Sequence, residues 1–395
     1  MDERVYWIWL QNAFGAGSAK PVQLVRRVGS AEAFYQGGVS LWSSFSFVSD
    51  KELSALSVYG VQEAEAALEY CLRLGQKVYT PDTPGYPALL QEIYNPPAVL
   101  YVRGALPARD SIAIGVVGTR KASAVGLRAA RAISYELALG DAAVISGGAL
   151  GIDSEAHRGA LNGRGKTVAV LPCGMDYPYL MDNAILRREI LDAGGALVTE
   201  YPMQTPVQRG AFQTRNRLIS GMAHGVLVVE APQKSGALIT ARYAVEQNRE
   251  VFVFVGEEEK AFAGCIHLAE DGAARVRTAE DILQVFAARR KHTRVAAIQE
   301  AAARVARPAK RVRVVALSDS EPSPVAVQPE APAVENDLST QAQRVLGTLG
   351  AEPRHVSQIE AETGLAAAEV LAALTELELL GKICCYPGQR FTKSG

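Results

Sequence analysis

The stretch Ile-Ala-Ile-Gly-Val-Val-Gly-Thr-Arg, residues 112–120, decides the fold of the central part of this chain. An apolar strand, buried on both faces, ends in a glycine, a hydroxyl and a guanidinium, and a helix-compatible segment begins a few residues later. An open α/β sheet builds an anion-binding turn in this way. Gly118 lets the backbone approach a phosphate closely, Thr119 adds a donor, and Arg120 adds a planar charge suited to two phosphate oxygens.

The alternation of apolar runs and helix-compatible segments continues well beyond this turn. It predicts strands at 112–117, 142–146, 167–171, 197–199, 226–230 and 251–255, and helices at 123–139, 153–162, 183–193 and 236–247. Strands that alternate with helices are joined by right-handed crossovers and form a parallel sheet, with the binding loops at the carboxyl ends of the strands. We therefore predict an α/β core.

The rest of the chain predicts smaller parts on either side of this core. Short apolar stretches between glycines predict a small helical domain, of the SAM or helix-hairpin type, over 1–80, before the core at 81–290. Residues 291–336 are first basic and then rich in proline and acids, which is typical of a linker. Residues 337–395 predict three helices and a short hairpin, the pattern of a winged helix.

The third helix of a winged helix usually reads a DNA groove. Here the stretch from Val356 to Gly381 holds five glutamates and no Lys or Arg, so it would be repelled by phosphates. We expect this domain to contact a protein instead.

The composition argues against a membrane protein, a secreted protein and a zinc-binding protein. The net charge is −1, no run of about eighteen apolar residues is present, and the segment Met1–Arg4 does not begin a secretory signal. The five cysteines form no Cys-x-x-Cys pair and no zinc spacing with the five histidines. We expect a cytoplasmic protein with reduced thiols, no metal and no membrane span.

Two downstream segments resemble the turn at Gly118. Ser146-Gly147-Gly148 follows a predicted strand, and Arg215-Asn216-Arg217 places two guanidinium groups at a predicted helix start. Phe212, just before them, is placed to stack on a base of single-stranded nucleic acid. Taken alone, these residues are also compatible with surface arginines and a core phenylalanine.

Other motifs have a structural alternative beside the functional one. Ser235 and Gly236 form a strand-to-helix turn in which Ser235 caps the helix and Gly236 permits close approach, which a purely structural turn explains nearly as well. Asp153 and His157 are four residues apart and share a helix face. A metal site or an acid–base pair is one interpretation, and a capping Asp near a packed or phosphate-facing His is the other.

Nucleotide cofactor motifs are absent. The segment from Ala160 to Thr167 approaches a P-loop, but its first glycine is an alanine and it precedes a strand instead of following one. No Gly-x-Gly-x-x-Gly occurs, so we expect no cofactor.

A series of ordered motifs resembles the bacterial DNA-processing protein A (DprA/Smf) family, most clearly over 85–275. The motifs are Tyr-Pro-Ala-Leu-Leu from Tyr86, Pro-Pro-Ala-Val-Leu-Tyr-Val-Arg-Gly from Pro96, Gly-Thr-Arg from Gly118, Ser-Gly-Gly-Ala-x-Gly-Ile-Asp from Ser146, Ala-His-Arg-Gly-Ala-Leu from Ala156, Thr-Val-Ala-Val-Leu from Thr167, Glu-Tyr-Pro from Glu200, Arg-Asn-Arg-Leu-Ile-Ser-Gly from Arg215, Val-Val-Glu-Ala from Val228 and Ser-Gly-Ala-Leu-Ile-Thr-Ala from Ser235.

The resemblance implies an extended Rossmann-like core that binds single-stranded DNA, protects incoming strands during natural transformation and loads the RecA recombinase onto them. It also implies a homodimer, with Gly264–Leu268 in the region of the dimer contact. Gly118, Thr119 and Arg120 would hold a phosphate, and Gly147 and Gly148 would line the same pocket. The strand path would continue over a further set, namely Phe212, Arg215, Asn216 and Arg217.

The chain departs from the family pattern at three places. Gln213 replaces a proline, Tyr179-Leu180-Met181 lacks the usual basic residue, and Phe254-Val255-Gly256 replaces Val-Pro-Gly. The second departure removes a positive charge that the family pattern offers to one phosphate, and it favours weaker or more cooperative binding.

Two other functions are alternatives to single-stranded DNA binding. Related folds cleave nucleotide monophosphates at the base–sugar bond, but they carry a Pro-Gly-Gly-x-Gly-Thr turn where this chain has Glu-Ala-Pro-Gln-Lys-Ser-Gly from Glu230. A scaffold with only protein partners would leave the arginine segments unexplained. We favour a non-catalytic single-stranded DNA-binding protein.

Overall fold

The structure is a computed structural model. It describes residues 1–287, 339–350, 354–365, 369–370, 373–374, 377, 382–386 and 390–393. The chain divides into two units, Met1–Ala309 and Lys310–Gly395. The predicted linker at 291–336 lies outside the described residues, and the three boundaries between the four predicted segments remain predictions.

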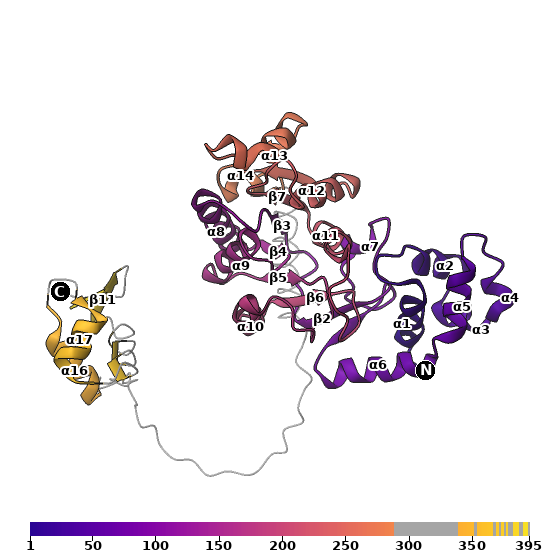
Figure 1. The fold of residues 1–395 in the computed structure, drawn as a ribbon, viewed down its shortest axis with the longest axis horizontal. Coiled ribbons are helices and arrows are strands. Elements are labelled where there is room, and N and C mark those ends of the chain that lie inside the picture. Colours follow the sequence, from indigo (N-terminus) through magenta and orange to yellow (C-terminus); the bar gives the residue numbers. More distant parts are fainter. Residues whose placement is uncertain are drawn as a thin grey trace, which may run out of the picture. The chain divides into compact units, whose positions relative to one another are not determined.

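A nine-stranded sheet in the order β1-β2-β6-β5-β4-β3-β7-β8-β9 forms the centre of the first unit (Figure 1). The strands are β1 Lys77–Tyr79, β2 Leu100–Gly104, β3 Ala113–Val117, β4 Ala143–Ser146, β5 Thr167–Val170, β6 Ala196–Thr199, β7 Gly225–Val228, β8 Glu250–Val253 and β9 Ala274–Arg275. From β6 to β9 all neighbours are parallel, with Ile114 of β3 in register with Val144 of β4 and Gly225 of β7. The six predicted strands and their parallel pairing are confirmed, whereas the antiparallel pair β1 and β2 was not predicted.

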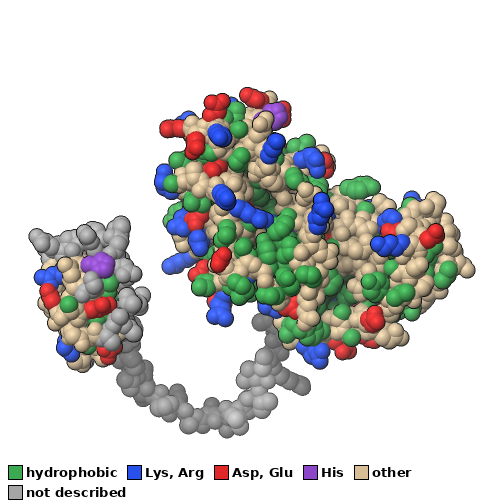
Figure 2. Space-filling model, in the orientation of Figure 1, with side chains coloured by type: hydrophobic (Ala, Val, Ile, Leu, Met, Phe, Trp, Pro, Cys, Tyr) green, Lys and Arg blue, Asp and Glu red, His purple; other side chains and the backbone are tan. Residues whose placement is uncertain are grey.

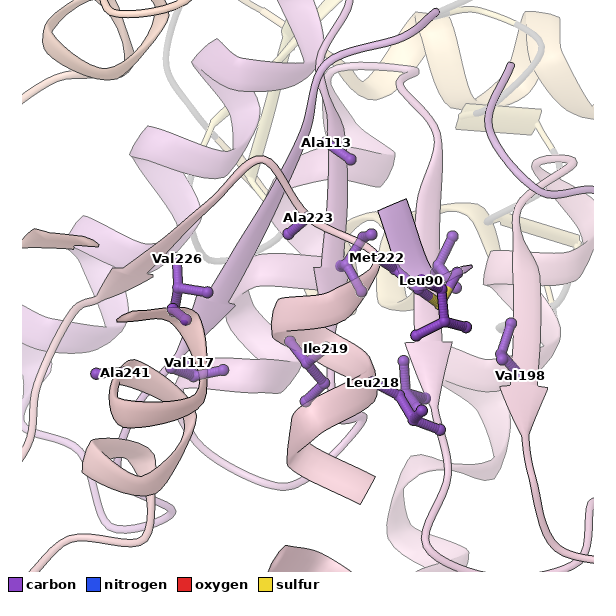
Figure 3. Packing of buried hydrophobic residues seen from close by; sticks show 14 of the residues in the cluster. Leu90, Ala113, Val117, Val198, Leu218, Ile219, Met222, Ala223, Val226 and Ala241 are labelled. Atoms are coloured by element: carbon purple, nitrogen blue, oxygen red, sulfur yellow. The ribbon is translucent and has the colours of Figure 1, made fainter. Parts of the chain in front are cut away.

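Helices cover both faces of the parallel strands, which explains why β3 to β7 are buried along their whole length and mostly apolar. Alternate residues of β3 enter different clusters: Ile114 and Val116 pack with α8 (Ala124–Leu139), α9 (Ile152–Asn162) and α14 (Ala279–Leu283). Ala113 and Val117 pack with the opposite layer, shown in Figure 3. That layer comprises α11 (Ala211–Gly221), α12 (Ala237–Glu246) and α13 (Glu259–Glu270), while α10 (Ala184–Asp192) covers β5 and β6.

Six helices precede the sheet, as the glycine-separated apolar stretches predicted. They are α1 Glu3–Phe14, α2 Lys20–Val28, α3 Ala31–Gln36, α4 Gly38–Trp42, α5 Asp50–Val58 and α6 Val61–Arg73, and the short α7 (Ala88–Gln91) lies between β1 and β2. Helix α1 is central, because Trp9 contacts Phe34 and Trp42 through its ring and donates its indole N–H to the carbonyl of Leu56 at 3.2 Å. Among the described residues, no helix is long and apolar enough to cross a membrane.

Glu200, the residue after β6, joins these helices to the sheet. Its carboxylate accepts the backbone N–H of Gly17, between α1 and α2, and forms an ion pair with Arg217 of α11. Its carbonyl oxygen accepts the side-chain amide of Gln11 at 2.5 Å. Both charged side chains are 2% exposed, so three elements meet at one buried ion pair.

The second unit contains α16 (Thr340–Thr348), α17 (Val356–Thr363) and an antiparallel sheet. The sheet has the order β10 (Arg354–His355), β12 (Arg390–Lys393) and β11 (Ile383–Tyr386). Two predicted helices and the hairpin strands are present. Most of the third predicted helix, at 367–380, lies outside the described residues.

We expect Arg217→Ala to lower the free energy of unfolding by about 3–5 kcal/mol, because it leaves the Glu200 charge buried without a partner. The matched control is Arg242→Ala, which removes a pair with Glu246 at 3.5 Å whose side chains are 67% and 56% exposed and should cost about 1 kcal/mol or less. Combining Arg217→Met with Glu200→Gln should recover part of the loss, since no charge remains buried. Urea denaturation measures all three, and equal losses for Arg217→Ala and Arg242→Ala would contradict the buried pair.

Candidate nucleic-acid interface

A pocket of about 510 Å³ opens at the carboxyl ends of β3 and β7. From β3 the chain continues to β4 on one side, and it returns after β6 to place β7 on the other side. Ligands of open α/β sheets bind at such a switch point. The residues lining the pocket are Val117, Gly118, Thr119, Arg120, Lys121, Ala149, Asp153, Phe212, Arg215, Asn216, Pro232, Lys234, Ser235, Gly236, Ala237 and Thr240. Eight of the eleven predicted site residues are therefore brought together.

The backbone of the turn after β3 packs closely against Glu230 and Ile152. The N–H of Thr119 donates to the carbonyl of Glu230 at 2.8 Å. A Cβ on Gly118 would lie 2.5 Å from Ile152 and 2.9 Å from that carbonyl, so only glycine allows this approach. The Glu230 carboxylate in turn accepts the N–H and hydroxyl of Ser123, the residue that caps α8. The position of Arg120 is thus fixed by its backbone, while its side chain is exposed.

Arg120 and Phe212 form a stack in the pocket. The guanidinium carbon of Arg120 lies 4.5 Å from the centre of the Phe212 ring. The same ring contacts the Tyr179 ring at a centroid distance of 6.1 Å. A cation over an aromatic face gains about 0.5–1 kcal/mol at an exposed site, so the free protein already holds a guanidinium and an aromatic ring together in this pocket.

Arg215 lies at the floor of the pocket and is 4% exposed. Its Nη1 donates to the carbonyl of Gly147 at 2.6 Å and to that of Val170. A Cβ on Gly147 would lie 2.6 Å from both terminal guanidinium nitrogens. Gly147 therefore makes room for Arg215. Neither Gly147 nor Gly148 is among the residues that line this pocket, where Ala149 lies instead, and their part in binding remains a prediction.

Arg217 does not reach the pocket either. The sequence placed it on a loop beside the phosphate path, but it lies inside α11, 1% exposed, and pairs with Glu200. Residues 215 and 217 of a helix point in nearly opposite directions, about 160° apart. One guanidinium can therefore reach the pocket while the other points to the junction with the amino-terminal helices.

His157 is packed in the core, as the structural interpretation predicts, whereas Asp153 is not the helix cap which that interpretation expected. Burial raises the pKa of the Asp153 carboxyl, against the opposing positive charge of Arg215, and its Oδ2 accepts the N–H of Ala149 at 3.4 Å. His157 is fully buried, its Nδ1 is 2.8 Å from the hydroxyl of Thr167, and burial lowers its pKa to about 3. The aspartate holds the loop before α9 and does not cap that helix. The described residues contain no group of three potential metal ligands.

The turn before α12 closes the pocket. Ser235 was predicted to cap α12, but the N-cap residue is Gly236, and no side-chain capping bond is formed. The Ser235 hydroxyl instead accepts the N–H of Ala237 at 3.3 Å. Asn216 donates to the carbonyl of Gly236 at 3.5 Å, which is a weak contact. Sequence reasoning missed Lys121 and Lys234, although each lies next to a quoted motif and both are exposed.

A smaller hollow of about 290 Å³ continues the surface past Arg120 and Lys121, which line both cavities. It also contains Arg158, whose Nη1 is 2.7 Å from Glu155. Figure 2 shows Lys and Arg side chains along the hollowed front of the core, between the α8/α9 and α11/α12 layers. A chain of phosphates could follow this surface.

The fold and this pocket define an extended Rossmann-like protein with an open pocket, lined by exposed basic residues, at the switch point of its sheet. Residues 77–287 match the family described as DNA recombination-mediator protein A, and residues 329–389 match the DprA winged helix domain. The chain belongs to this family. The predicted fold class, with its carboxyl-terminal winged helix, is confirmed.

Two relatives and one solved structure resemble most of the chain. Protein Smf of Synechocystis sp. is 36% identical over 328 residues, covering 80% of this chain and 79% of the relative. Protein Smf of Escherichia coli is 34% identical over 308 residues, covering 78% and 75%. The X-ray structure of DNA processing protein A from Streptococcus pneumoniae is 26% identical with a TM-score of 0.62, covering 72% of this chain and 98% of that one.

The buried His157 predicts a specific pH dependence of stability. Its pKa is 6.5 ordinarily and about 3 in the folded chain, so between these values the unfolded state binds a proton that the folded state does not. Stability therefore falls as the pH falls, and from pH 7 to pH 5 this residue should remove about 2 kcal/mol. His157→Gln should show a smaller loss over that interval, whereas His267→Gln, at a site 67% exposed, should not change it. Identical pH profiles for His157→Gln and wild type would refute a buried neutral imidazole.

Proposed function

We propose that this chain binds single-stranded DNA in the pocket at the carboxyl ends of β3 and β7, without catalysing a reaction on it. The observation that carries the proposal is the Arg120–Phe212 stack at 4.5 Å, open at the rim beside Lys121 and Lys234. A cation supplies the phosphate contact, and an aromatic ring supplies a face for a base that is not paired. In a duplex the base faces are covered, so the stack favours a single strand.

The charges around the pocket support binding without chemistry. Asp153 is the one carboxylate among the described lining residues, and it is buried beside Arg215. Glu230, behind the pocket, is engaged by Ser123. A hydrolase acting at the base–sugar bond needs a carboxylate that can reach the sugar or activate water. A fluorescent oligo-dT titration, run against duplex DNA and against deoxynucleoside monophosphate hydrolysis, separates the two functions; hydrolysis would replace this proposal.

The family description, DNA recombination-mediator protein A, supports a role after binding. We infer that the chain protects incoming single strands in the cytoplasm during natural transformation and loads the RecA recombinase onto them. We also infer a homodimer through the region of Gly264–Leu268 in α13, where Cys265 is buried and His267 is exposed. RecA filament formation on oligo-dT, with and without the chain, tests the loading role, and sedimentation tests the dimer.

Arg120→Ala should weaken oligo-dT binding by about 1–3 kcal/mol and reduce the salt dependence by about 0.7 in log–log slope, because one phosphate contact no longer releases a counterion. Phe212→Ala should weaken binding with the slope nearly unchanged, since stacking releases no counterions. Arg109→Ala is the matched control, because it removes an exposed arginine at the amino ends of the strands. Equal affinity for Arg120→Ala and Arg109→Ala would remove Arg120 from the DNA path.

The stack also predicts that these two residues do not act independently. In a double-mutant cycle on oligo-dT affinity, Arg120→Ala and Phe212→Ala should differ from additivity by about 0.5 kcal/mol or more, because their side chains are in contact. The pair Arg109→Ala with Phe212→Ala should be additive. Additivity in both cycles would show that the stack has no role in the bound state.

The acidic character of 356–381 predicts that the second unit is dispensable for DNA binding. A chain ending near Val325 should keep its oligo-dT affinity within about threefold, which is under 1 kcal/mol. A large loss of affinity would instead place part of the DNA site in the second unit.

A further inference from the structure

A second cavity, of about 480 Å³, lies at the amino ends of the central strands, whereas the DNA pocket lies at their carboxyl ends. Its floor contains Ala113, the first residue of β3, with Met222 and His224, which precede β7. Ala113 and Met222 are labelled in Figure 3 among the core residues. The five residues of β3 separate this floor from the turn at Gly118, a distance of about 16 Å. The two cavities are therefore distinct sites.

The walls of this cavity come from segments that DNA binding does not explain. The Tyr86-Pro87-Ala-Leu-Leu motif lines it, together with the proline-rich loop before it and the loop at 105–111. The loop is closed by its own hydrogen bonds: Thr80 donates its N–H to the Thr83 hydroxyl at 3.1 Å, and Thr83 donates its N–H to the Thr80 carbonyl at 2.8 Å. Tyr86 donates its hydroxyl to the carbonyl of Pro97 at 2.9 Å. The cavity is thus preformed, which reduces the ordering cost of binding.

The charged side chains described at the rim of this cavity are all positive. Lys77 and Arg109 line the cavity and are exposed, and no Asp or Glu occurs among the described lining residues. Neither cation forms an ion pair within the described part of the chain. Tyr79 and Tyr86 supply aromatic surface, and Leu89, Leu106 and Met222 add apolar surface. At the floor, Nδ1 of His224 accepts the N–H of Ala113 at 3.1 Å.

We propose that this cavity binds a small molecule with a flat aromatic body and one anionic group. The aromatic body lies between the tyrosines and the apolar floor, and the anionic group lies between Lys77 and Arg109. A volume of about 480 Å³ is within the range of about 300–1,000 Å³ that is usual for small-molecule sites. A nucleoside monophosphate and an aromatic carboxylate share this chemistry, and the proposal does not depend on the DNA site.

Isothermal titration of the full chain with deoxynucleoside monophosphates, 1-naphthoate and inorganic phosphate tests the proposal. We expect one of the two aromatic anions to saturate a single site, and the one that binds identifies the source of the ligand. Inorganic phosphate should bind at least about tenfold more weakly, because it lacks the aromatic body. Arg109→Ala should weaken the aromatic anion about tenfold, the effect of losing one charge-assisted hydrogen bond, and Lys77→Ala should act similarly.

Two further variants locate the binding. Ala108→Trp, on the exposed loop at the cavity, should block it without changing a charge, and Arg120→Ala at the DNA pocket should leave it intact. Oligo-dT affinity should be unchanged in all three cavity variants, which also shows that they fold. The proposal is overturned if neither aromatic anion binds at millimolar concentration, if phosphate binds equally well, or if binding survives Arg109→Ala and Ala108→Trp. Loss of binding in Arg120→Ala would place the anion in the DNA pocket and also overturn it.

Discussion

The buried ion pair between Glu200 and Arg217 is the constraint on which the arrangement of the first unit depends. It connects the end of β6, helix α11 and the turn between α1 and α2 at one point. Because buried charges gain little net stability over apolar residues, the main consequence of the pair is geometric. It fixes the rotation of α11, and a Cβ on Gly17 would lie only 2.7 Å from Thr214 of the same helix. The rotation places Phe212 and Asn216 at the pocket.

The charged residues at the pocket therefore form two groups with different roles. Arg215 and Glu230 are buried and hydrogen-bonded to the backbone, so they shape the pocket. Arg120 and Lys234 are exposed at its rim and remain available to phosphates. Burial lowers the pKa of Arg215, which expresses the cost of keeping its charge away from water. That cost is offset by two carbonyl oxygens and by the nearby Asp153.

The sequence predicted the features that depend on local pattern. The central strands were predicted because a strand buried on both faces is apolar throughout, and the turn at Gly118 because its residues are adjacent in the chain. The pair β1 and β2 was missed, since proline-rich flanks at 81–87 and 96–97 obscure short strands. Arg217 was misplaced because its partner Glu200 is seventeen residues away and lies in a separate motif. Charged side chains are rarely fully buried, so the exposed position was the better expectation.

The Arg120–Phe212 stack has a consequence for how a strand would enter the pocket. In the free protein the guanidinium covers one face of the ring, an interaction of about 0.5–1 kcal/mol. A base stacking on the ring contributes about 1–3 kcal/mol, and a charge-assisted hydrogen bond from Arg120 to phosphate about 1.5–3 kcal/mol. Exchanging the first contact for the other two is favourable. In the binding mode that we propose, Arg120 covers the ring in the free protein and contacts the strand's backbone when DNA binds, and the fixed turn at Gly118 keeps it within reach of both.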